Sequence, residues 1–130
     1  MAKILIAIDH KWRDLPGYVY AGLLLEKHGH KVYYVRNGLH EWIIPRLSPN
    51  LILLTHLYDK SEQDLSKYYH RNGIKIALMP TEGIPTLEKY RSFAVGQNCD
   101  LSGVDLHFVW NELMAELLSQ TIQLTKKKLL

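Results

Sequence analysis

The sequence holds one cysteine, Cys99, among its 130 residues. One cysteine cannot form an internal disulfide, which suits a reducing compartment. No apolar run approaches the ~20 residues needed to cross a bilayer. The first residues lead directly into an apolar segment, so we expect no signal peptide and a cytoplasmic location. Lys and Arg number 16 against 13 acidic residues and are scattered except at 126–128, which argues against a nucleic-acid-binding protein.

Several motifs for nucleotide or phosphate chemistry are also missing. The sequence has neither GxGxxG after its first apolar run nor GxxxxGK[ST] anywhere, and the segment 9–14 contains no glycine. A loop of that kind does not wrap a dinucleotide pyrophosphate. The third apolar run ends in Thr55-His56 rather than in an aspartate, which argues against a phosphoacceptor domain of the response-regulator type.

The polar residues that follow the predicted strands show no close metal-ligand spacing such as HxH or HxxxH, and His28 and His30, which flank the glycine at the end of the first predicted helix, are expected to be surface residues. Asp9, His10, His56 and Glu82 together could hold a metal. Without a tight pair among them, we expect no metal site. Cys99 has no assignable base, so a nucleophilic role is not expected for it either.

Short apolar runs of strand type alternate with segments of helical spacing along the whole chain. The strands are predicted over residues 3–8, 31–35, 50–55, 74–79 and 104–109, and the helices over 16–28, 39–47, 61–72, 86–94 and 112–124. This alternation, with short connections, predicts right-handed βαβ units. We therefore expect residues 1–130 to form one α/β domain, a doubly wound, Rossmann-like parallel sheet of about five strands with helices on both faces.

The helical spacing also predicts which side chains face the core. The expected core positions are Val19, Leu23 and Leu24 in the first helix, and Leu39, Trp42, Ile43 and Leu47 in the second. Gly22 lies inside the first helix, where glycine costs about 1 kcal/mol relative to alanine. A close approach between this helix and the sheet would explain it.

Each predicted strand ends in polar residues. Parallel strands bring these residues to one edge of the sheet, which is where open α/β sheets bind ligands. The edge would gather Asp9, His10, Arg13, Arg36, Asn37, His56, Asp59, Thr81, Glu82, Gly83, Trp110 and Asn111. The alternative is that these are ordinary loop residues, because any α/β domain has polar loops at both edges.

Glu82 is the candidate catalytic residue. It follows a strand, precedes a helix and lies between Thr81 and Gly83, where a glycine permits close approach of a substrate. It could be a general base, a hydrogen-bond acceptor that orients a sugar hydroxyl, or a turn residue. A helix starting near Pro85 would favour the ionised carboxylate and reduce its basicity. The candidate substrate-binding residues are Asp9, His10, Arg13, His56, Thr81 and Gly83.

Five segments together resemble a known family. They are KILIAID (3–9), WRDLPGYVYAGLLLEKHGHKV (12–32), PNLILLTHLY (49–58), GIKIALMPTEG (73–83) and VDLHFVWNELMAELL (104–118). The chain resembles the amino-terminal half of bacterial surface-carbohydrate biosynthesis proteins of the GT-B glycosyltransferase type, which build capsule and lipopolysaccharide. Residues 26–32 and 80–83 are the most specific parts, although Thr81 stands where such proteins often carry an acidic residue.

The resemblance implies a two-domain enzyme with its active site between the domains. The amino-terminal domain would hold the glycan acceptor, and a carboxyl-terminal domain would bind the nucleotide-sugar donor, so this domain alone would bind no cofactor and be inactive. The apolar pair Leu129-Leu130 is typical of a new strand, which leads us to expect a longer native protein. Peripheral membrane association is compatible with this interpretation. A stand-alone flavodoxin-like binding module and half of a sugar-nucleotide epimerase are the alternatives.

Overall fold

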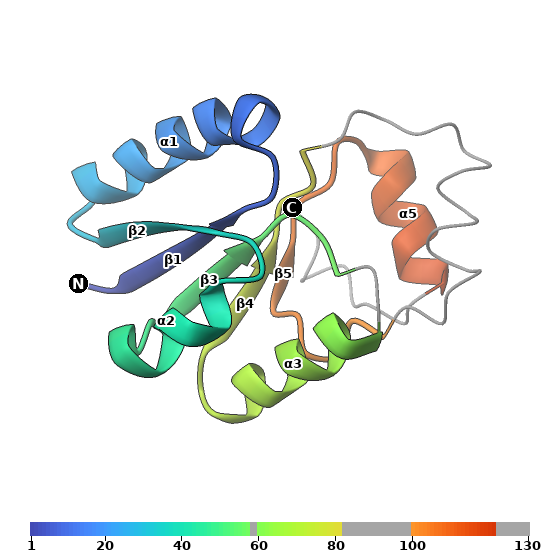
Figure 1. Cartoon of the computed structure of the whole chain (residues 1–130). Helices are drawn as coiled ribbons and strands as arrows, with labels where there is room; N and C mark the ends of the chain where they lie inside the picture. Colours follow the sequence, from blue (N-terminus) through green and yellow to red (C-terminus); the bar gives the residue numbers. More distant parts are fainter. Residues whose placement is uncertain (58–59, 82–99, 122–130) are drawn as a thin grey trace.

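The computed structural model describes residues 1–57, 60–81 and 100–121 of the protein. Its centre is a sheet of five parallel strands in the order β2-β1-β3-β4-β5 (Figure 1). The strands are β1 (Lys3–Ile8), β2 (Lys31–Arg36), β3 (Leu51–Leu54), β4 (Lys75–Leu78) and β5 (Leu106–His107). The predicted α/β class with five parallel strands is therefore confirmed.

Four helices are described, and they connect or follow these strands. They are α1 (Lys11–Lys27), α2 (His40–Leu47), α3 (Lys60–Arg71) and α5 (Glu112–Thr121). The helix predicted at 86–94 lies outside the described residues. None of the described helices combines the length and apolar character needed to cross a membrane.

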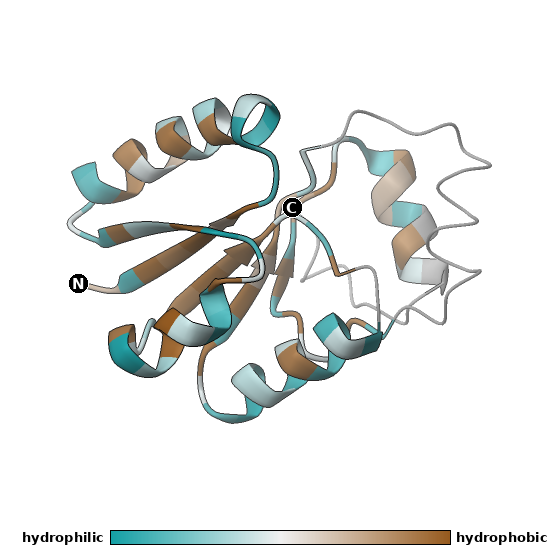
Figure 2. Ribbon diagram, in the orientation of Figure 1, coloured by the Kyte–Doolittle hydropathy of each residue, from teal (hydrophilic) through white to brown (hydrophobic). Residues whose placement is uncertain are grey.

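The two faces of the sheet pack against different helices. Side chains along a strand alternate between faces, and β1 sends Ile4, Ile6 and Ile8 towards Tyr18 of α1. The intervening residues of β1, together with those of β3 and β4, pack with Ile44 of α2 and with α3. Figure 2 shows β1, β3 and β4 as hydrophobic over most of their length, as expected for strands covered on both faces, whereas most residues of the edge strand β2 are exposed.

Helix α1 starts five residues earlier than predicted. His10 caps it, since its Nδ1 accepts a hydrogen bond from the Arg13 backbone N–H at 3.2 Å. The Asp14 carboxylate accepts one in return from the His10 backbone N–H at 2.8 Å. This reciprocal pair acts like a capping box. The prediction of a polar loop over 9–14 was wrong, and Pro16 lies inside the helix instead of opening it.

The predicted core stripes of α1 and α2 were wrong at most positions, although Leu47 is partly buried and packs against the core. Leu23 is 57% exposed and Trp42 is 77% exposed, whereas α1 buries Asp14 and Tyr18. The Tyr18 hydroxyl donates to the Met79 carbonyl at 2.5 Å. Buried polar groups must be hydrogen-bonded, and these contacts fix the rotation of α1 on the sheet. Several apolar side chains consequently face solvent.

Two glycines permit close approaches between elements. A Cβ on Gly22 would lie 1.8 Å from the Tyr34 hydroxyl of β2, so the predicted close approach at Gly22 is confirmed. The atom that approaches Gly22, however, belongs to the end of the Tyr34 side chain, which can move. A Cβ on Gly103 would lie 2.6 Å from the Lys67 backbone nitrogen. The chain leading into β5 therefore lies directly against the backbone of α3.

Candidate functional site

The strand order places a topological switch point at the carboxyl ends of β1 and β3. The chain goes from β1 to β2 on one side, then crosses back to β3 on the other side of β1. Crevices for ligands form where successive connections diverge in this way. Any ligand site of this sheet is therefore expected beside Asp9, which follows β1, and His56, which follows β3.

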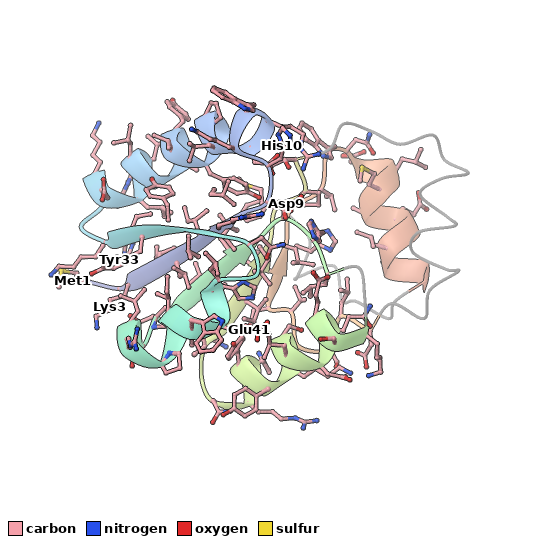
Figure 3. The ribbon with its side chains drawn as sticks, in the orientation of Figure 1. Met1, Lys3, Asp9, His10, Tyr33 and Glu41 are labelled. Carbon is pink, nitrogen blue, oxygen red and sulfur yellow. The ribbon has the colours of Figure 1, made fainter. Side chains whose placement is uncertain are left out.

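A pocket of about 250 Å³ lies at this point, on the side of the sheet covered by α2 and α3. Its polar lining comes from the ends of three strands, from the first turn of α2 and from the length of α3. These residues are Asp9, Arg36, Asn37, Gly38, His40, Glu41, His56, Ser61, Glu62, Ser66 and Tyr69. Figure 3 shows Asp9 at the end of β1 and Glu41 on α2, with His10 at the start of α1.

The charges of the pocket are predominantly negative. Three carboxylates, those of Asp9, Glu41 and Glu62, stand against one guanidinium, that of Arg36. With neutral imidazoles the lining therefore carries two more negative than positive charges. Such a lining attracts groups that donate hydrogen bonds and disfavours phosphate or carboxylate ligands.

Both ring nitrogens of His56 lie near polar groups. The Thr55 hydroxyl lies 2.8 Å from Nδ1, and the Glu62 carboxylate lies 3.9 Å from Nε2. The side chain is 12% exposed. An imidazole that is oriented by a hydroxyl and faces a carboxylate is suited to accepting a proton from a bound hydroxyl group.

His40 and Tyr69 form the buried part of the pocket lining, each with 8% of its surface exposed. Burial lowers the pKa of His40 and outweighs the opposing effect of Glu41 and Glu62. The imidazole is then neutral at pH 7. The Gly38 backbone N–H donates to its Nδ1 at 3.3 Å, so the ring proton lies on Nε2.

The Tyr69 hydroxyl stays protonated as well. Burial raises its pKa to about 12, and the charge of Glu41 contributes to the rise. Neither this hydroxyl nor Nε2 of His40 has a hydrogen-bond partner among residues 1–57, 60–81 and 100–121. Both groups are therefore donors that the described part of the protein leaves unused.

On the opposite side of the same sheet edge, the polar groups bond to one another. Asp14 is 1% exposed, and its carboxylate accepts hydrogen bonds from Arg13 Nε at 2.6 Å, the Thr81 hydroxyl at 2.7 Å and the His10 backbone N–H at 2.8 Å. Burial acts to raise the pKa of Asp14, but the hydrogen bonds from Arg13, Thr81 and His10 outweigh it and hold the pKa below its usual value. We call this set the Asp14 network.

The predicted site residues divide between these two places. Asp9 and His56 line the pocket, as do Arg36 and Asn37 from the predicted edge. His10, Arg13 and Thr81 belong to the Asp14 network, although Arg13 also reaches the Asp9 carboxylate at 3.4 Å. The predicted catalytic Glu82 lies outside the described residues, and so do Gly83 and Asp59.

Sequence reasoning missed five residues of these two places: the buried His40, Tyr69 and Asp14, the half-buried Glu62 and the exposed Glu41. His40 and Glu41 lie only three or four residues beyond the predicted edge position Asn37. Extending the predicted edge into the first turn of the following helix would have found them. Tyr69 lies in the last turns of α3 and no sequence signal marks it as a pocket residue.

No three His, Cys, Asp or Glu side chains in the described segments are grouped to hold a metal ion. Comparison of the chain with models of protein families, with curated proteins and with solved structures found no match. The candidate site therefore depends on its geometry and on the sequence resemblance.

Proposed function

We propose that this chain is the acceptor-side domain of a glycosyltransferase of bacterial surface polysaccharide biosynthesis. It would hold a glycan acceptor while a sugar is transferred from a nucleotide-activated donor. The observation that supports this best is the small, carboxylate-rich pocket at the switch point, with His56 oriented in its lining. The sequence resemblance to GT-B glycosyltransferases supplies the type of reaction.

Glycosyl transfer needs a base beside the acceptor. The acceptor hydroxyl oxygen bonds to the anomeric carbon, the bond from that carbon to the nucleoside diphosphate breaks, and the hydroxyl proton passes to the base. His56 is one candidate base, because it lines the pocket and faces Glu62. Glu82, three residues after Met79 at the end of β4, is the other.

The donor would bind outside this pocket. A nucleoside diphosphate is an anion, and the pocket carries one guanidinium against three carboxylates. The sequence also lacks the glycine-rich loops that bind phosphates. A carboxyl-terminal nucleotide-sugar-binding domain, as the resemblance implies, would supply the donor site.

The test uses the full-length native protein with a panel of nucleotide sugars and surface-glycan acceptors. Release of nucleoside diphosphate that depends on the acceptor is expected. Replacing the true base, in His56→Gln or Glu82→Gln, should lower kcat about 10²-fold or more while acceptor affinity is kept. Tyr20→Phe, an exposed change on α1, is the matched control. If no donor gives acceptor-dependent release of nucleoside diphosphate, the transferase proposal is wrong.

One observation favours a second candidate, a stand-alone flavodoxin-like binding module without catalysis. The order β2-β1-β3-β4-β5 is that of flavodoxin-like domains, which bind ligands at the β1/β3 switch point within a single domain. Ligand binding without nucleotide release, together with a native reading frame that stops at Leu130, would favour this candidate. A second βαβ array after Leu130 would favour the transferase.

A further inference from the structure

The pocket combines two kinds of hydrogen-bonding group. Its buried part presents donors, the Nε2–H of His40 and the hydroxyl of Tyr69, neither of which has a partner in the described structure. Its remaining lining presents the carboxylates of Asp9, Glu41 and Glu62, which only accept. A ligand that fits must therefore accept hydrogen bonds at one end and donate them at others.

We propose that this pocket binds a hydroxyl-rich ligand without an anionic group, such as one sugar ring or a polyol of similar size, with His40 Nε2 and the Tyr69 hydroxyl donating to its oxygens. That this pocket is the acceptor site rests on the proposed function. The ligand class goes further, because it states which chemical groups of an acceptor the pocket would bind.

The chemistry of the ligand follows from the lining. A hydroxyl group both donates and accepts, so it can satisfy His40 or Tyr69 and a carboxylate at the same time. A phosphate or carboxylate ligand only accepts and would meet the excess negative charge. An ammonium group only donates, so it can pair with the carboxylates but cannot accept from His40 or Tyr69, for which hydroxyl oxygens are needed.

The size of the pocket limits the ligand to a small molecule. Pockets for drug-sized ligands measure roughly 300 to 1,000 Å³, and this one measures about 250 Å³. It therefore accommodates a single ring, and the remainder of a longer glycan would lie outside the pocket.

The experiment compares matched monosaccharides on the 130-residue chain by amide NMR titration. The probes are glucose and galactose, each with its uronate. We expect one of the neutral sugars to shift the amides of the pocket residues, 36–41 and 61–69, and to bind at least about fivefold more tightly than its uronate. A uronate that binds there as tightly as the neutral sugar would overturn the inference. So would a lack of binding by either neutral sugar and by inositol and glycerol.

Two variants test the named donors. Tyr69→Phe removes only the hydroxyl. His40→Asn keeps an oxygen near the position of Nδ1, to accept from Gly38, and removes the Nε2 donor. Each should weaken binding of the neutral sugar about five- to tenfold. The control is Tyr68→Phe, which removes the hydroxyl of the exposed neighbour and should leave affinity unchanged.

A thermal unfolding scan of each variant accompanies the titration. The Tyr69 hydroxyl has no partner in the described structure, so Tyr69→Phe should unfold at or above the temperature of the parent. Equal affinity of both variants and the parent would contradict the roles of His40 and Tyr69. If the chain binds sugars with these preferences but the full-length protein has no transferase activity, the proposed function is wrong and the proposed ligand class is still supported.

Discussion

The two sides of the sheet's carboxyl edge handle polar groups in opposite ways. On the α1 side, Asp14 is fully buried and its oxygens are bonded to Arg13, Thr81 and the backbone of His10. On the side of α2 and α3, His40 and Tyr69 are nearly as buried, yet each keeps an unused donor towards a pocket.

The difference separates polar residues that stabilise the fold from candidate ligand-binding ones. A satisfied buried network contributes to stability and positions the elements that it joins. Donors that open into a pocket make no hydrogen bond within the described fold, so they remain available to a ligand. Sequence proximity to the strand ends does not distinguish the two, because both sets lie within a few residues of the same edge.

The largest expected effect concerns the packing that holds α3 beside the pocket. Gly103→Ala places a Cβ 2.6 Å from the Lys67 backbone nitrogen, and backbone cannot move aside as a side chain can. We expect the free energy of unfolding to fall by about 3 kcal/mol, measured by urea denaturation with the m-value compared between proteins.

Gly17→Ala in α1 is the control for that change. A Cβ there would meet nothing within 4 Å, so the better helix propensity of alanine should raise stability by up to about 1 kcal/mol. A Gly103→Ala protein as stable as the parent would show that the α3 side of the pocket is adjustable.

The Asp14 network gives the next largest effect. Asp14→Asn keeps the shape of the side chain but replaces one accepting oxygen with an NH₂ group. We expect a loss of about 2 kcal/mol of unfolding free energy at neutral pH. Asp64→Asn is the control, because Asp64 is an exposed carboxylate paired with Lys60 and Lys67, and exposed ion pairs contribute little.

The pH dependence of that loss has a defined sign. Since the folded pKa of Asp14 is lowered, its carboxylate stabilises the fold above the unfolded value of about 4 and loses that contribution as the pH falls through the folded pKa. The difference in unfolding free energy between the parent and Asp14→Asn should therefore become smaller at acid pH. A gap that stays constant down to acid pH would contradict an ionised Asp14.

His107 of β5 offers the smallest effect. Its Nδ1 is buried and without a partner in the described structure, and burial lowers its pKa to about 4. The unfolded chain takes up a proton below about pH 6.5, and the folded chain does so only near pH 4. Stability is therefore lost as the pH falls between these values, by about 1 kcal/mol from pH 7 to pH 5.5.

His107→Leu removes this titration, so the unfolding free energy of the variant should fall less steeply than that of the parent over the same pH interval. The two slopes are compared by urea denaturation at each pH. Equal slopes of unfolding free energy against pH would mean that water reaches His107 in the folded protein. The pKa of His107 would then not be lowered by burial.

The strands were predictable because each one is a local apolar run. The stretch KILIAI is strand β1 to the residue, and only β5 is much shorter than expected, with two residues in place of the predicted 104–109. Helix faces were less predictable. Trp42 fits an apolar stripe, yet α2 buries His40 and Ile44 instead, because packing on the sheet selected a face offset from the most apolar one.

Part of the candidate site was visible in the sequence as well. Asp9, Arg36, Asn37 and His56 were placed at one edge by the alternation of strands and helices, and the structure gathers them around one pocket. His10 was expected to bind substrate but caps α1. Its capping contact involves residues three and four positions later, which the assumed loop over 9–14 concealed.

The sequence by itself determined that the chain forms alternating strands and helices whose polar ends share one edge, because hydrophobic spacing is a local property. Only the tertiary structure decided the rest. The strand order put β1 between β2 and β3 and so located the switch point. The bond from Thr81 to Asp14, 67 positions apart in the chain, and the pocket between α2 and α3 arise from packing between distant segments. For that reason the tertiary structure alone separates the satisfied Asp14 from the unused donors His40 and Tyr69.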